Sequence, residues 1–495
     1  MNGAVNSIHD IKDLILKFEH DFPVDQWKIN GIHIWPKIRF KLYIHLCEYV
    51  LKPNQKPVQI QQKNLSTTIT RSNVTQWWND FKEFILLTRQ IKDNKLVFFG
   101  HSMHKVLRDS LLFNRFFDSM IDHHNLYDTA ITFDFDKLVL PVHNRSKTID
   151  LTAAVRHYRR VKRLKEKFFN RAPVISNISV SHYDAFFTFC ENQTWFTHDL
   201  GLDLNAVTSW TKKIKNDLAF YKWCFLKADC QKVIFVSYYG FDSTASAIVA
   251  ANDLNIETVE FQHGPITHLH MAYSHWTKVP DAGFNTMPLT YWVWDKYTAL
   301  NFENWIQPPN KTVVVHQPWL GYSLKNNGQD KTVHTLNIPK VLYTLQLLSL
   351  STLEEVFPPA LVEAMRLRDY HFLLRFHPRN RHEKETYINY LKGQKVPRSK
   401  YSFQDPKRVP LSDAMVNSAV HITLWSGSLL EAILLNLPTI IFHEIGLMHY
   451  DNYLDDDLVE YANPATNELL KKLDLFIKND NQADTNQIIY NPLDC

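Results

Sequence analysis

SDAMVNSAVHITLWSGSLLEAILLNLPTIIF, residues 412–442, decides the fold because it predicts helix, strand, polar turn, helix and strand in succession. The apolar strand 420–424 runs into the turn 425–428, on which the second helix opens. Free backbone N–H groups and the positive end of a helix dipole meet at such a turn. In a parallel sheet the turn lies at the carboxyl edge, where ligands bind. We therefore expect this edge to hold a phosphate group.

Four residues of this turn and helix are the candidates for that site: Ser426, Gly427, Ser428 and Glu431. The hydroxyl and N–H groups of the turn would hold the phosphate, and Glu431 would bind ribose hydroxyls. A second interpretation is open, because Ser428 and Glu431 have the spacing of the S-x-x-E capping box that begins many helices. Both interpretations can hold together.

A second candidate phosphate contact follows the predicted strand 371–376, in the segment Arg375-Phe376-His377-Pro378. At the carboxyl edge, the His377 ring can donate a hydrogen bond to phosphate oxygens. Pro378 fixes the geometry of the turn. Taken alone, this segment is also consistent with an ordinary strand-end turn that carries a surface histidine.

A polar wall is predicted after the strand 258–261, where ionisable side chains follow a buried run. A glycine in this segment permits a sharp turn. The histidine spacing suggests a metal site, but no nearby carboxylate or cysteine completes a sensible ligand set, so we expect none. The residues concerned are Glu260, Gln262, His263, Gly264 and His268.

Asp242 lies between the predicted strand 232–237 and a helix from about residue 243 to 252. One interpretation is that Asp242 caps the helix. The other is that it acts as a general base at the edge of a ligand cleft, with Tyr239 as a neighbouring cleft residue.

The composition excludes several classes of protein. The 495-residue chain is long enough for two or three domains. Five scattered cysteines without a C-x-x-C pair argue against a zinc site or a disulfide framework. The P-loop motif and the GxGxxG motif do not occur, which argues against a P-loop ATPase and a dinucleotide dehydrogenase. The net charge of +4 does not indicate a nucleic-acid partner.

The sequence also bears on location. No signal peptide is visible, and polar residues interrupt the longest apolar run, 422–442. We expect a cytoplasmic protein or a peripheral one at the inner face of a membrane. The segment Arg156–Arg171 carries eight basic residues against Glu166 alone. Such a helix rests on anionic lipid, meets an anionic glycan, or is simply a solvated helix face.

Strands alternate with helices along most of the chain, which predicts an α/β fold with parallel sheets. We predict two Rossmann-like domains, 1–325 and 326–495, that face each other across a cleft. The first domain includes a mostly helical part, about 1–90, before its sheet begins near residue 95. The first series of predicted strands is 95–99, 128–133, 185–188, 232–237 and 258–261, and a second series begins at Lys340.

Taken together, these motifs resemble the GT-B glycosyltransferases of bacterial capsule and lipopolysaccharide biosynthesis. The likeness is greatest to the transferases that use CMP-linked Kdo or sialic-acid-like sugars. It spans most of the chain from about residue 230 onward, and an early segment, 27–39, is similar as well. The motifs that carry it are 260–264 (EFQHG), His377-Pro378, Ser426-Gly427-Ser428, Glu431-Ala432 and Leu437-Pro438.

The resemblance implies an inverting transfer from a nucleotide-activated donor, a CMP-linked ulosonic acid, to a surface polysaccharide acceptor without metal or cofactor. The C-terminal domain would bind the donor through Arg375, His377, Pro378, the serine turn and Glu431. The N-terminal domain would bind an oligosaccharide or lipid-linked glycan and supply the base, which is left open among Asp242, Glu260 and His263. The cleft residues would be Tyr239, Gln262, Gly264 and His268.

Two alternatives remain open at the level of sequence. One is a polyol-phosphate transferase of the teichoic-acid type that uses CDP-glycerol or CDP-ribitol. The other is a non-catalytic glycan-binding or export-assembly protein with a degenerate transferase fold.

Overall fold

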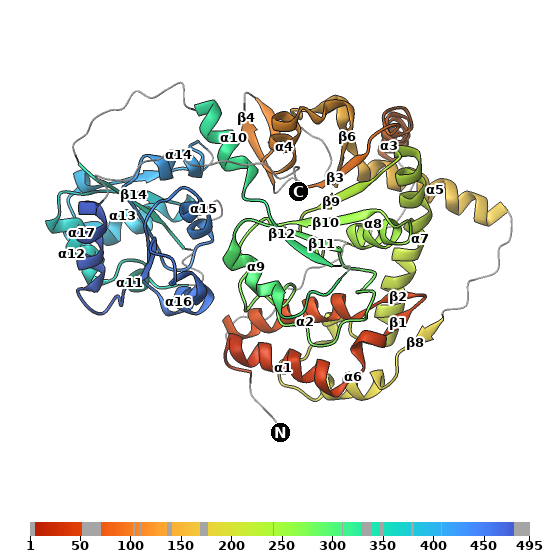
Figure 1. The fold of residues 1–495 in the computed structure, drawn as a ribbon, viewed down its shortest axis with the longest axis horizontal. Coiled ribbons are helices and arrows are strands. Elements are labelled where there is room, and N and C mark those ends of the chain that lie inside the picture. The colour runs from red at the N-terminus through yellow and green to blue at the C-terminus, as the bar shows by residue number, and fades with distance from the viewer. Residues whose placement is uncertain are drawn as a thin grey trace. The chain divides into compact units, whose positions relative to one another are not determined.

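The structure is a computed structural model (Figure 1). It describes residues 5–51, 71–101, 104–108, 110–135, 141–168, 177–240, 242–308, 310–327, 338–346, 351–377, 381–406 and 408–479. The chain divides into two compact units, Met1–Val314 (unit 1) and Val315–Cys495 (unit 2). Each unit has its own parallel sheet and its own apolar core. The predicted α/β class with two Rossmann-like parallel sheets is therefore confirmed, and the cleft stays a prediction.

Unit 1 is built on a seven-stranded sheet in the order β12-β11-β10-β9-β3-β6-β7, with every neighbouring pair parallel. The central strands are continuous apolar runs because helices on both faces of a parallel sheet bury them. Their bounds are β3 (Leu96–Gly100), β6 (Ala130–Asp134), β7 (Thr148–Asp150), β9 (Lys232–Phe235), β10 (Glu257–Phe261), β11 (Thr290–Val293) and β12 (Lys311–Val314).

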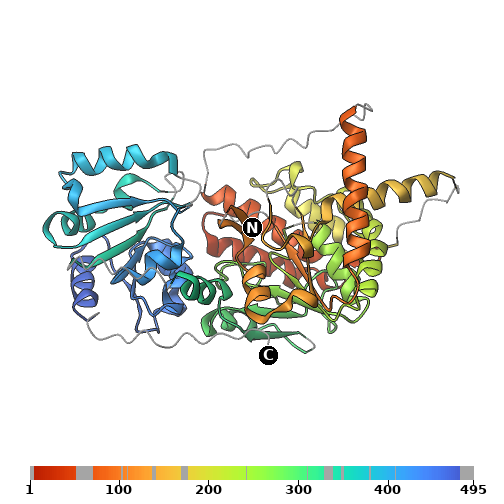
Figure 2. The ribbon, with the colours of Figure 1, turned by 90° about the horizontal axis from the view of Figure 1, so that it is seen from above.

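The helices of unit 1 include two, α3 and α5, that pack against each other and project beyond the rest of the unit (Figure 2). The α-helices are α1 (Ile8–Asp21), α2 (Trp35–Leu51), α3 (Arg71–Gln90), α4 (Phe117–His124), α5 (Leu151–Phe168), α6 (Tyr183–Glu191), α7 (Leu204–Ala228), α8 (Asp242–Asn252) and α9 (Lys296–Glu303). Among the described helices of the chain, none combines the length and the apolar character that a bilayer span requires.

Two small antiparallel sheets complete unit 1. One joins β1 (Lys28–Ile29) to β2 (Ile32–His33) and to β8 (Ile178–Ser179). The other is the hairpin of β4 (Lys105–Arg108) and β5 (Leu111–Asn114).

A buried ion pair fastens the N-terminal helices to the rest of unit 1. Arg39 Nε of α2 donates to Glu19 Oε1 of α1 at 2.7 Å, and neither side chain is exposed. Both members of the pair also bond to the segment 274–277. Arg39 Nη2 donates to the carbonyls of Ser274 and His275, and the Glu19 carboxylate accepts from Thr277. The helical N-terminal part is therefore integral to unit 1.

Unit 2 contains a six-stranded parallel sheet in the order β15-β14-β13-β16-β17-β18. The stretch 412–442 supplies two of its strands, as its pattern predicts. The strands are β13 (Lys340–Thr344), β14 (His371–Arg375), β15 (Tyr401–Gln404), β16 (Val420–Thr423), β17 (Thr439–Ile441) and β18 (Val459–Tyr461). The helices are α10 (Pro318–Asn327), α11 (Leu353–Val356), α12 (Pro359–Leu367), α13 (Lys384–Gly393), α14 (Leu411–Val416), α15 (Ser428–Leu434), α16 (Glu444–His449) and α17 (Glu468–Asn479).

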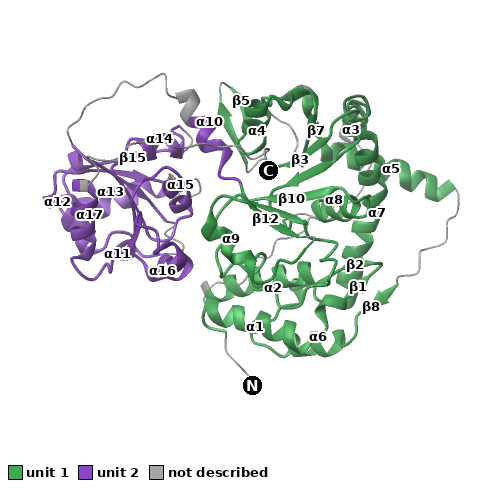
Figure 3. Cartoon of the chain, viewed as in Figure 1, with its two compact units in different colours: residues 1–314 green, residues 315–495 purple. Residues whose placement is uncertain are grey.

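The division between the units falls after Val314, eleven residues before the boundary expected from the sequence at 325/326 (Figure 3). The difference is α10, which packs on α14 of unit 2. The hydroxyls of Ser323 and Ser412 join these two helices at 2.6 Å. A polar linker composition shows only where the regular pattern of the sequence ends. The unit to which α10 belongs is decided by its packing.

One predicted strand, 185–188, is wrong, because these residues lie in α6. The buried residues of α6 are Tyr183, Phe186 and Cys190, which have the spacing of one helix face. Phe186 packs edge-on against Phe18 and Trp27. A short apolar run cannot distinguish a strand from a buried helix by itself.

Candidate functional site

Three neighbouring strand ends bring Arg375, Thr344 and Thr423 together at the carboxyl edge of the unit 2 sheet. The parallel register pairs Thr344 with Arg375 on one side and with Thr423 on the other. All three side chains are buried. This is the edge at which the sequence predicts a phosphate site.

Arg375 is a buried cation that forms no direct ion pair among the described residues, although the nearby carboxylates of Glu431, Asp413 and Asp405 act on its charge. It is 7% exposed, and its Nη1 donates to Oε1 of Gln404 at 2.6 Å. Burial lowers the pKa of its guanidinium to about 10, which still leaves it charged at pH 7. A buried charge is costly unless an opposite charge accompanies it. The edge of this sheet is therefore suited to an anion.

The Ser428 hydroxyl is occupied by the protein itself. Its Oγ lies 3.0 Å from Thr344 Oγ1 and 3.2 Å from His421 Nε2, and the Thr344 hydroxyl lies 2.9 Å from the same imidazole nitrogen. Burial lowers the pKa of His421 to about 3, so the ring is neutral. The Ser428 hydroxyl thus fastens the first turn of α15 to β13 and β16, and we assign it a positioning role.

The capping-box interpretation of this turn is wrong, because Gly427 is the N-cap and no side chain caps α15. Ser428 N instead donates to Ser426 Oγ at 3.3 Å, and the next two N–H groups bond to the carbonyls of Ser426 and Gly427. The helix has only seven residues. Most of the N–H groups predicted to hold phosphate are thus already bonded, which leaves Arg375 as the main electrostatic feature of the edge.

Glu431 and His377 lie near this edge. Glu431 Oε1 accepts from Nε2 of Gln317 at 3.1 Å, so its carboxylate is tied to the segment that precedes α10 rather than to its own helix. His377 is half-buried and lies two residues beyond the end of β14. Pro378 lies outside the described residues. The predicted roles of Glu431 at ribose and of His377 at phosphate stay predictions.

In unit 1, Glu260 is buried at the carboxyl end of β10 and 1% exposed. Its two oxygens accept from the backbone N–H groups of Ser237 and Tyr238, at 2.8 and 3.1 Å, and from the Tyr273 hydroxyl. Ser237 has a φ of 63°, a conformation that costs energy for a residue with a side chain. Glu260 therefore holds the strained loop after β9, which is a positioning role.

His263 follows β10, and its Nδ1 is buried without a hydrogen-bond partner among the described residues. Burial, together with the nearby Arg115 charge, lowers its pKa to about 4, so the imidazole is neutral at pH 7. A Cβ added at the next residue, Gly264, would meet no atom within 4 Å, so open space borders the backbone there. A neutral imidazole has a lone pair that can accept a proton from a hydroxyl, although the burial that lowers its pKa also makes it a weaker base.

Of the neighbouring residues predicted for the cleft, Gln262 supports loops and Tyr239 packs against other rings. The Gln262 side chain is fully buried and bridges two loops, because its Oε1 accepts from Trp294 N at 2.7 Å and its Nε2 donates to the Gly264 carbonyl. The Tyr239 ring lies 6.3 Å from that of His263 and 4.1 Å from that of Phe40. The structure therefore brings Tyr239 and His263 together.

His268 is directed to a different neighbour. Its ring centroid lies 6.4 Å from that of His275, in the segment that anchors the N-terminal helices. The described residues contain no group of three or more histidine, cysteine, aspartate or glutamate side chains that could hold a metal ion.

Asp242 is the first residue of α8, and its carboxylate is 44% exposed. Oδ1 accepts from Lys37 Nζ at 3.2 Å and from Trp210 Nε1 at 2.9 Å. A cavity of about 20 Å³, lined in part by Lys37, Trp210 and Tyr239, lies beside these partners. The carboxylate is therefore held in place by two donors from distant parts of the chain.

Several residues of these edges were not predicted from the sequence. His104, whose ring lies 6.1 Å from that of His263, comes four residues after β3, and the strand-end rule that indicates His263 also applies to it. Thr344 ends β13 and satisfies the same rule. By contrast, no local signal indicates Lys37 or Trp210 as partners of Asp242.

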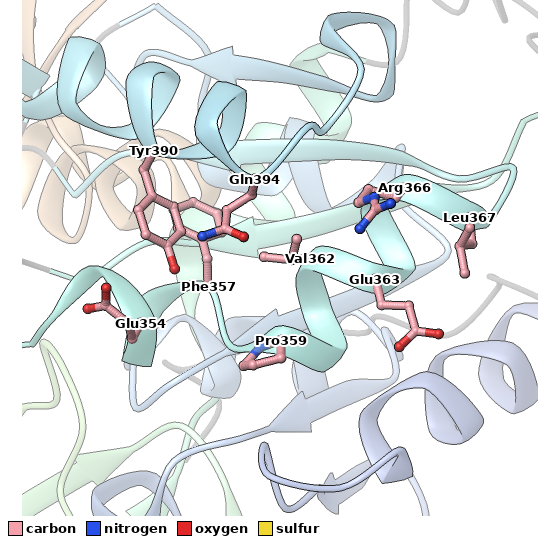
Figure 4. Close-up of a pocket in the computed structure, with 9 residues that line it drawn as sticks. All are labelled: Glu354, Phe357, Pro359, Val362, Glu363, Arg366, Leu367, Tyr390 and Gln394. Atoms are coloured by element: carbon pink, nitrogen blue, oxygen red, sulfur yellow. The ribbon is translucent and has the colours of Figure 1, made fainter.

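A larger pocket in unit 2, of about 540 Å³, lies away from the predicted residues (Figure 4). In Figure 4, Tyr390 extends from α13, Gln394 follows the end of that helix, and Val362 and Arg366 extend from α12. None of the residues predicted from the sequence lines this pocket. Its lining is Glu354, Phe357, Pro359, Val362, Glu363, Arg366, Leu367, Tyr390 and Gln394.

No protein-family model and no curated protein sequence matches the chain. Solved structures are similar to it at low identity. UDP-GlcNAc 2-epimerase from Neisseria meningitidis, bound to UDP-GlcNAc, is 14% identical with a TM-score of 0.45, over 78% of this chain and 93% of that one.

The UDP-GlcNAc 2-epimerase from Methanocaldococcus jannaschii is 13% identical with a TM-score of 0.43, over 77% of this chain and 92% of that one. The wall teichoic acid polymerase TagF is 12% identical with a TM-score of 0.38, over 84% and 92%. At these values the likeness carries no argument about substrate or reaction.

Proposed function

We propose that this protein is a glycosyltransferase that moves a sugar from a nucleotide-activated donor, a CMP-linked ulosonic acid, to a bacterial surface polysaccharide. The observation that carries the proposal is Arg375, a buried cation at the carboxyl edge of a parallel sheet that forms no direct ion pair among the described residues and whose burial outweighs the attraction of Glu431, Asp413 and Asp405. A nucleotide leaving group brings an anion that can form the direct ion pair that Arg375 does not make within the described residues. The choice of CMP and of the acceptor rests on the resemblance of the sequence.

In this proposal unit 2 binds the donor. Arg375 and His377 contact the phosphate, and Glu431 contacts the ribose. Ser428 keeps the turn 426–428 rigid through its bonds to Thr344 and His421. Preorganised donors aimed at a leaving phosphate stabilise the charge that develops in the transition state.

Unit 1 supplies the proton acceptor, which we assign to His263. The acceptor hydroxyl attacks the anomeric carbon, and its proton passes to the imidazole. As the new C–O bond forms, the bond from that carbon to the phosphate oxygen breaks, and the nucleotide leaves with the electron pair. A single displacement of this kind inverts the anomeric configuration.

His263 is preferred to the other two candidate bases because of how each is bonded. Asp242 already accepts two hydrogen bonds, one from the cation of Lys37. The oxygens of Glu260 accept three hydrogen bonds in the interior. His263 has a buried nitrogen without a hydrogen-bond partner among the described residues, and open space borders the backbone of the next residue, Gly264.

The proposal is tested first by binding. A thermal-shift series with CMP, CDP, UDP and GDP should give the largest rise in melting temperature with CMP, since a ligand that binds the folded state stabilises it. Arg375→Gln should abolish that rise, whereas Arg366→Gln, an exposed arginine of the same unit, should retain it. Equal shifts in both variants would remove Arg375 from the site.

Turnover then separates the candidate reactions. Release of CMP from a CMP-linked ulosonic acid in the presence of an oligosaccharide acceptor supports the proposal. Release of CMP only from CDP-glycerol or CDP-ribitol would replace the donor and make the protein a polyol-phosphate transferase. Glycan binding without release of nucleotide from any activated donor would overturn the enzymatic proposal.

A further inference from the structure

The N-terminal half of α3 exposes a row of large apolar side chains. Val74, Trp77 and Trp78 are 59%, 52% and 55% exposed. Their spacing of three and four residues puts them on one side of the helix. A contiguous exposed apolar patch on a folded unit marks an interaction site more often than scattered single residues do. We therefore expect this row of apolar side chains to contact a binding partner.

The second half of α5 combines exposed apolar and basic side chains. Leu164 and Phe168 are 54% and 81% exposed, and Arg163, Lys165 and Lys167 beside them are exposed as well. Residues 162–168 contain four basic residues and one carboxylate, that of Glu166. This end of α5 is both hydrophobic and strongly positive.

The first half of the predicted basic segment has a different role, because its arginines are used inside unit 1. Arg156 and Arg160 bond to Asp80 of α3, and Arg159 bonds to Asp217 of α7. Residues 169–171 of that segment lie outside the described residues. The predicted anionic-lipid surface is thereby narrowed to the projecting end of α5.

The exposed parts of α3 and α5 belong to one helix pair. The two helices pack together, with the carboxylate of Asp80 bridging them, and both project from the body of unit 1, with their free ends pointing in different directions (Figure 2). The carboxylates in the described part of α3 are neutralised, since Asp80 and Glu83 each pair with arginine. Lys82 Nζ lies 5.6 Å from the Trp78 ring. The pair thus presents indole rings and cations, and its one other described carboxylate, that of Glu166, lies 3.9 Å from Lys162 Nζ.

We propose that this α3–α5 surface, formed by Val74, Trp77, Trp78, Lys82, Arg163, Leu164, Lys165, Lys167 and Phe168, binds the surface of an anionic lipid bilayer. Indole rings favour the headgroup region, where their apolar part is buried and their N–H remains hydrated. Lysine and arginine side chains next to them gain from the negative surface potential. An anionic bilayer matches both features, and the binding is independent of sugar transfer.

The test is flotation of the full-length protein with vesicles, measured without any glycan or nucleotide. The protein should float with vesicles of phosphatidylethanolamine and phosphatidylglycerol, and stay unbound with pure phosphatidylcholine. Trp77→Ser/Trp78→Ser should weaken the partition coefficient about tenfold or more. Arg163→Ser/Lys165→Ser/Lys167→Ser should weaken it roughly tenfold to a hundredfold, with a reduced salt dependence.

Matched controls come from α7 of the same unit. Leu226→Ser removes a side chain that is 68% exposed, and Lys212→Ser/Lys213→Ser/Lys215→Ser removes three exposed lysines. Both should float like the wild type. Circular dichroism melting curves establish that each variant is folded. The proposal is overturned if the wild type stays unbound with anionic vesicles, or if the α7 variants lose as much binding as the α3 and α5 variants.

Discussion

The Tyr273 hydroxyl donates a 2.7 Å hydrogen bond to Glu260 Oε1 in the interior of unit 1. Burial is the main cause that raises the pKa of Glu260 from its ordinary 4.5 to about 8, although Tyr273 and two backbone N–H groups oppose the shift. The folded protein therefore binds a proton at this site over a pH range in which the unfolded chain has lost it. This difference makes the stability of unit 1 depend on pH.

The expected sign follows from that pKa. A carboxyl group whose folded pKa is raised contributes stability below pH 4.5, and the contribution is lost as pH rises through 8. Glu260→Gln removes the titration, so its free energy of unfolding should fall less between pH 5 and pH 8 than that of the wild type. Urea unfolding at several pH values measures both slopes. Parallel curves for the two proteins would contradict this account of Glu260.

The buried pair of Glu19 and Arg39 should be a large contributor to the stability of unit 1. Glu19→Ala leaves the guanidinium buried without its carboxylate, which typically costs about 3–5 kcal/mol. Urea unfolding should register this as a lower midpoint with an unchanged slope. Lys17→Ala, in an exposed pair with Asp21, is the control and should cost less than about 1 kcal/mol. Similar losses in both variants would refute the central role of the pair.

Arg375 should stabilise the ligand complex at the expense of the ligand-free protein. Burial lowers the pKa of Arg375 more than Glu431, Asp413 and Asp405 raise it, so replacing this cation by an apolar side chain of similar length removes a net desolvation cost. Arg375→Met should therefore raise the free energy of unfolding of the ligand-free protein by roughly 1–3 kcal/mol. The same variant should lose its response to CMP. A less stable variant that still responds to CMP would be the opposite of what the geometry predicts.

Ser428 should behave differently from Arg375, because its hydroxyl bonds to protein groups. Ser428→Ala removes the contacts to Thr344 and His421 and should cost about 1–3 kcal/mol of stability. Once folded, it should bind CMP with an affinity within a few-fold of the wild type. Isothermal titration calorimetry measures that affinity. A loss of binding as large as that of Arg375→Gln would instead assign the hydroxyl to the phosphate.

His263 should affect turnover far more than folding. Removing a positioned proton acceptor typically lowers the rate about 10²–10⁴-fold. His263→Ala should show this loss in nucleotide release, with a melting temperature near that of the wild type. Asp242→Asn is the comparison, since its carboxylate is held by Lys37 and Trp210. If Asp242→Asn is inactive and His263→Ala is not, the base is Asp242.

Much of the fold could be predicted from the sequence. The strands near residues 96–100, 130–134, 232–235, 257–261, 371–375 and 420–423 are apolar runs that end in polar turns, and each was expected within a few residues. Such strands can be recognised in the sequence as continuous apolar runs because strands of parallel sheets are buried on both faces. The run 185–188 is apolar as well, but it is helical, and Phe186 packs against Phe18 and Trp27 from the buried face of that helix.

The candidate site could be predicted only in part. The strand-end rule indicates His263 and Arg375, because the carboxyl edge of a parallel sheet is set by local order along the chain. The same rule cannot say that Ser428 bonds to Thr344, or that Asp242 bonds to Lys37 and Trp210. These contacts join segments that are far apart in the sequence.

By itself, therefore, the sequence determined the alternation of strands and helices and the edge at which polar residues gather, because both follow from short-range periodicity. The tertiary structure decided which polar groups are satisfied and which lack a partner among the described residues. The register of β13 between β14 and β16 puts Thr344 beside both Arg375 and Thr423. The same packing occupies the Ser428 hydroxyl and leaves Arg375 hydrogen-bonded to Gln404 without a direct ion pair in the described part of unit 2, and only three-dimensional neighbours can make that distinction.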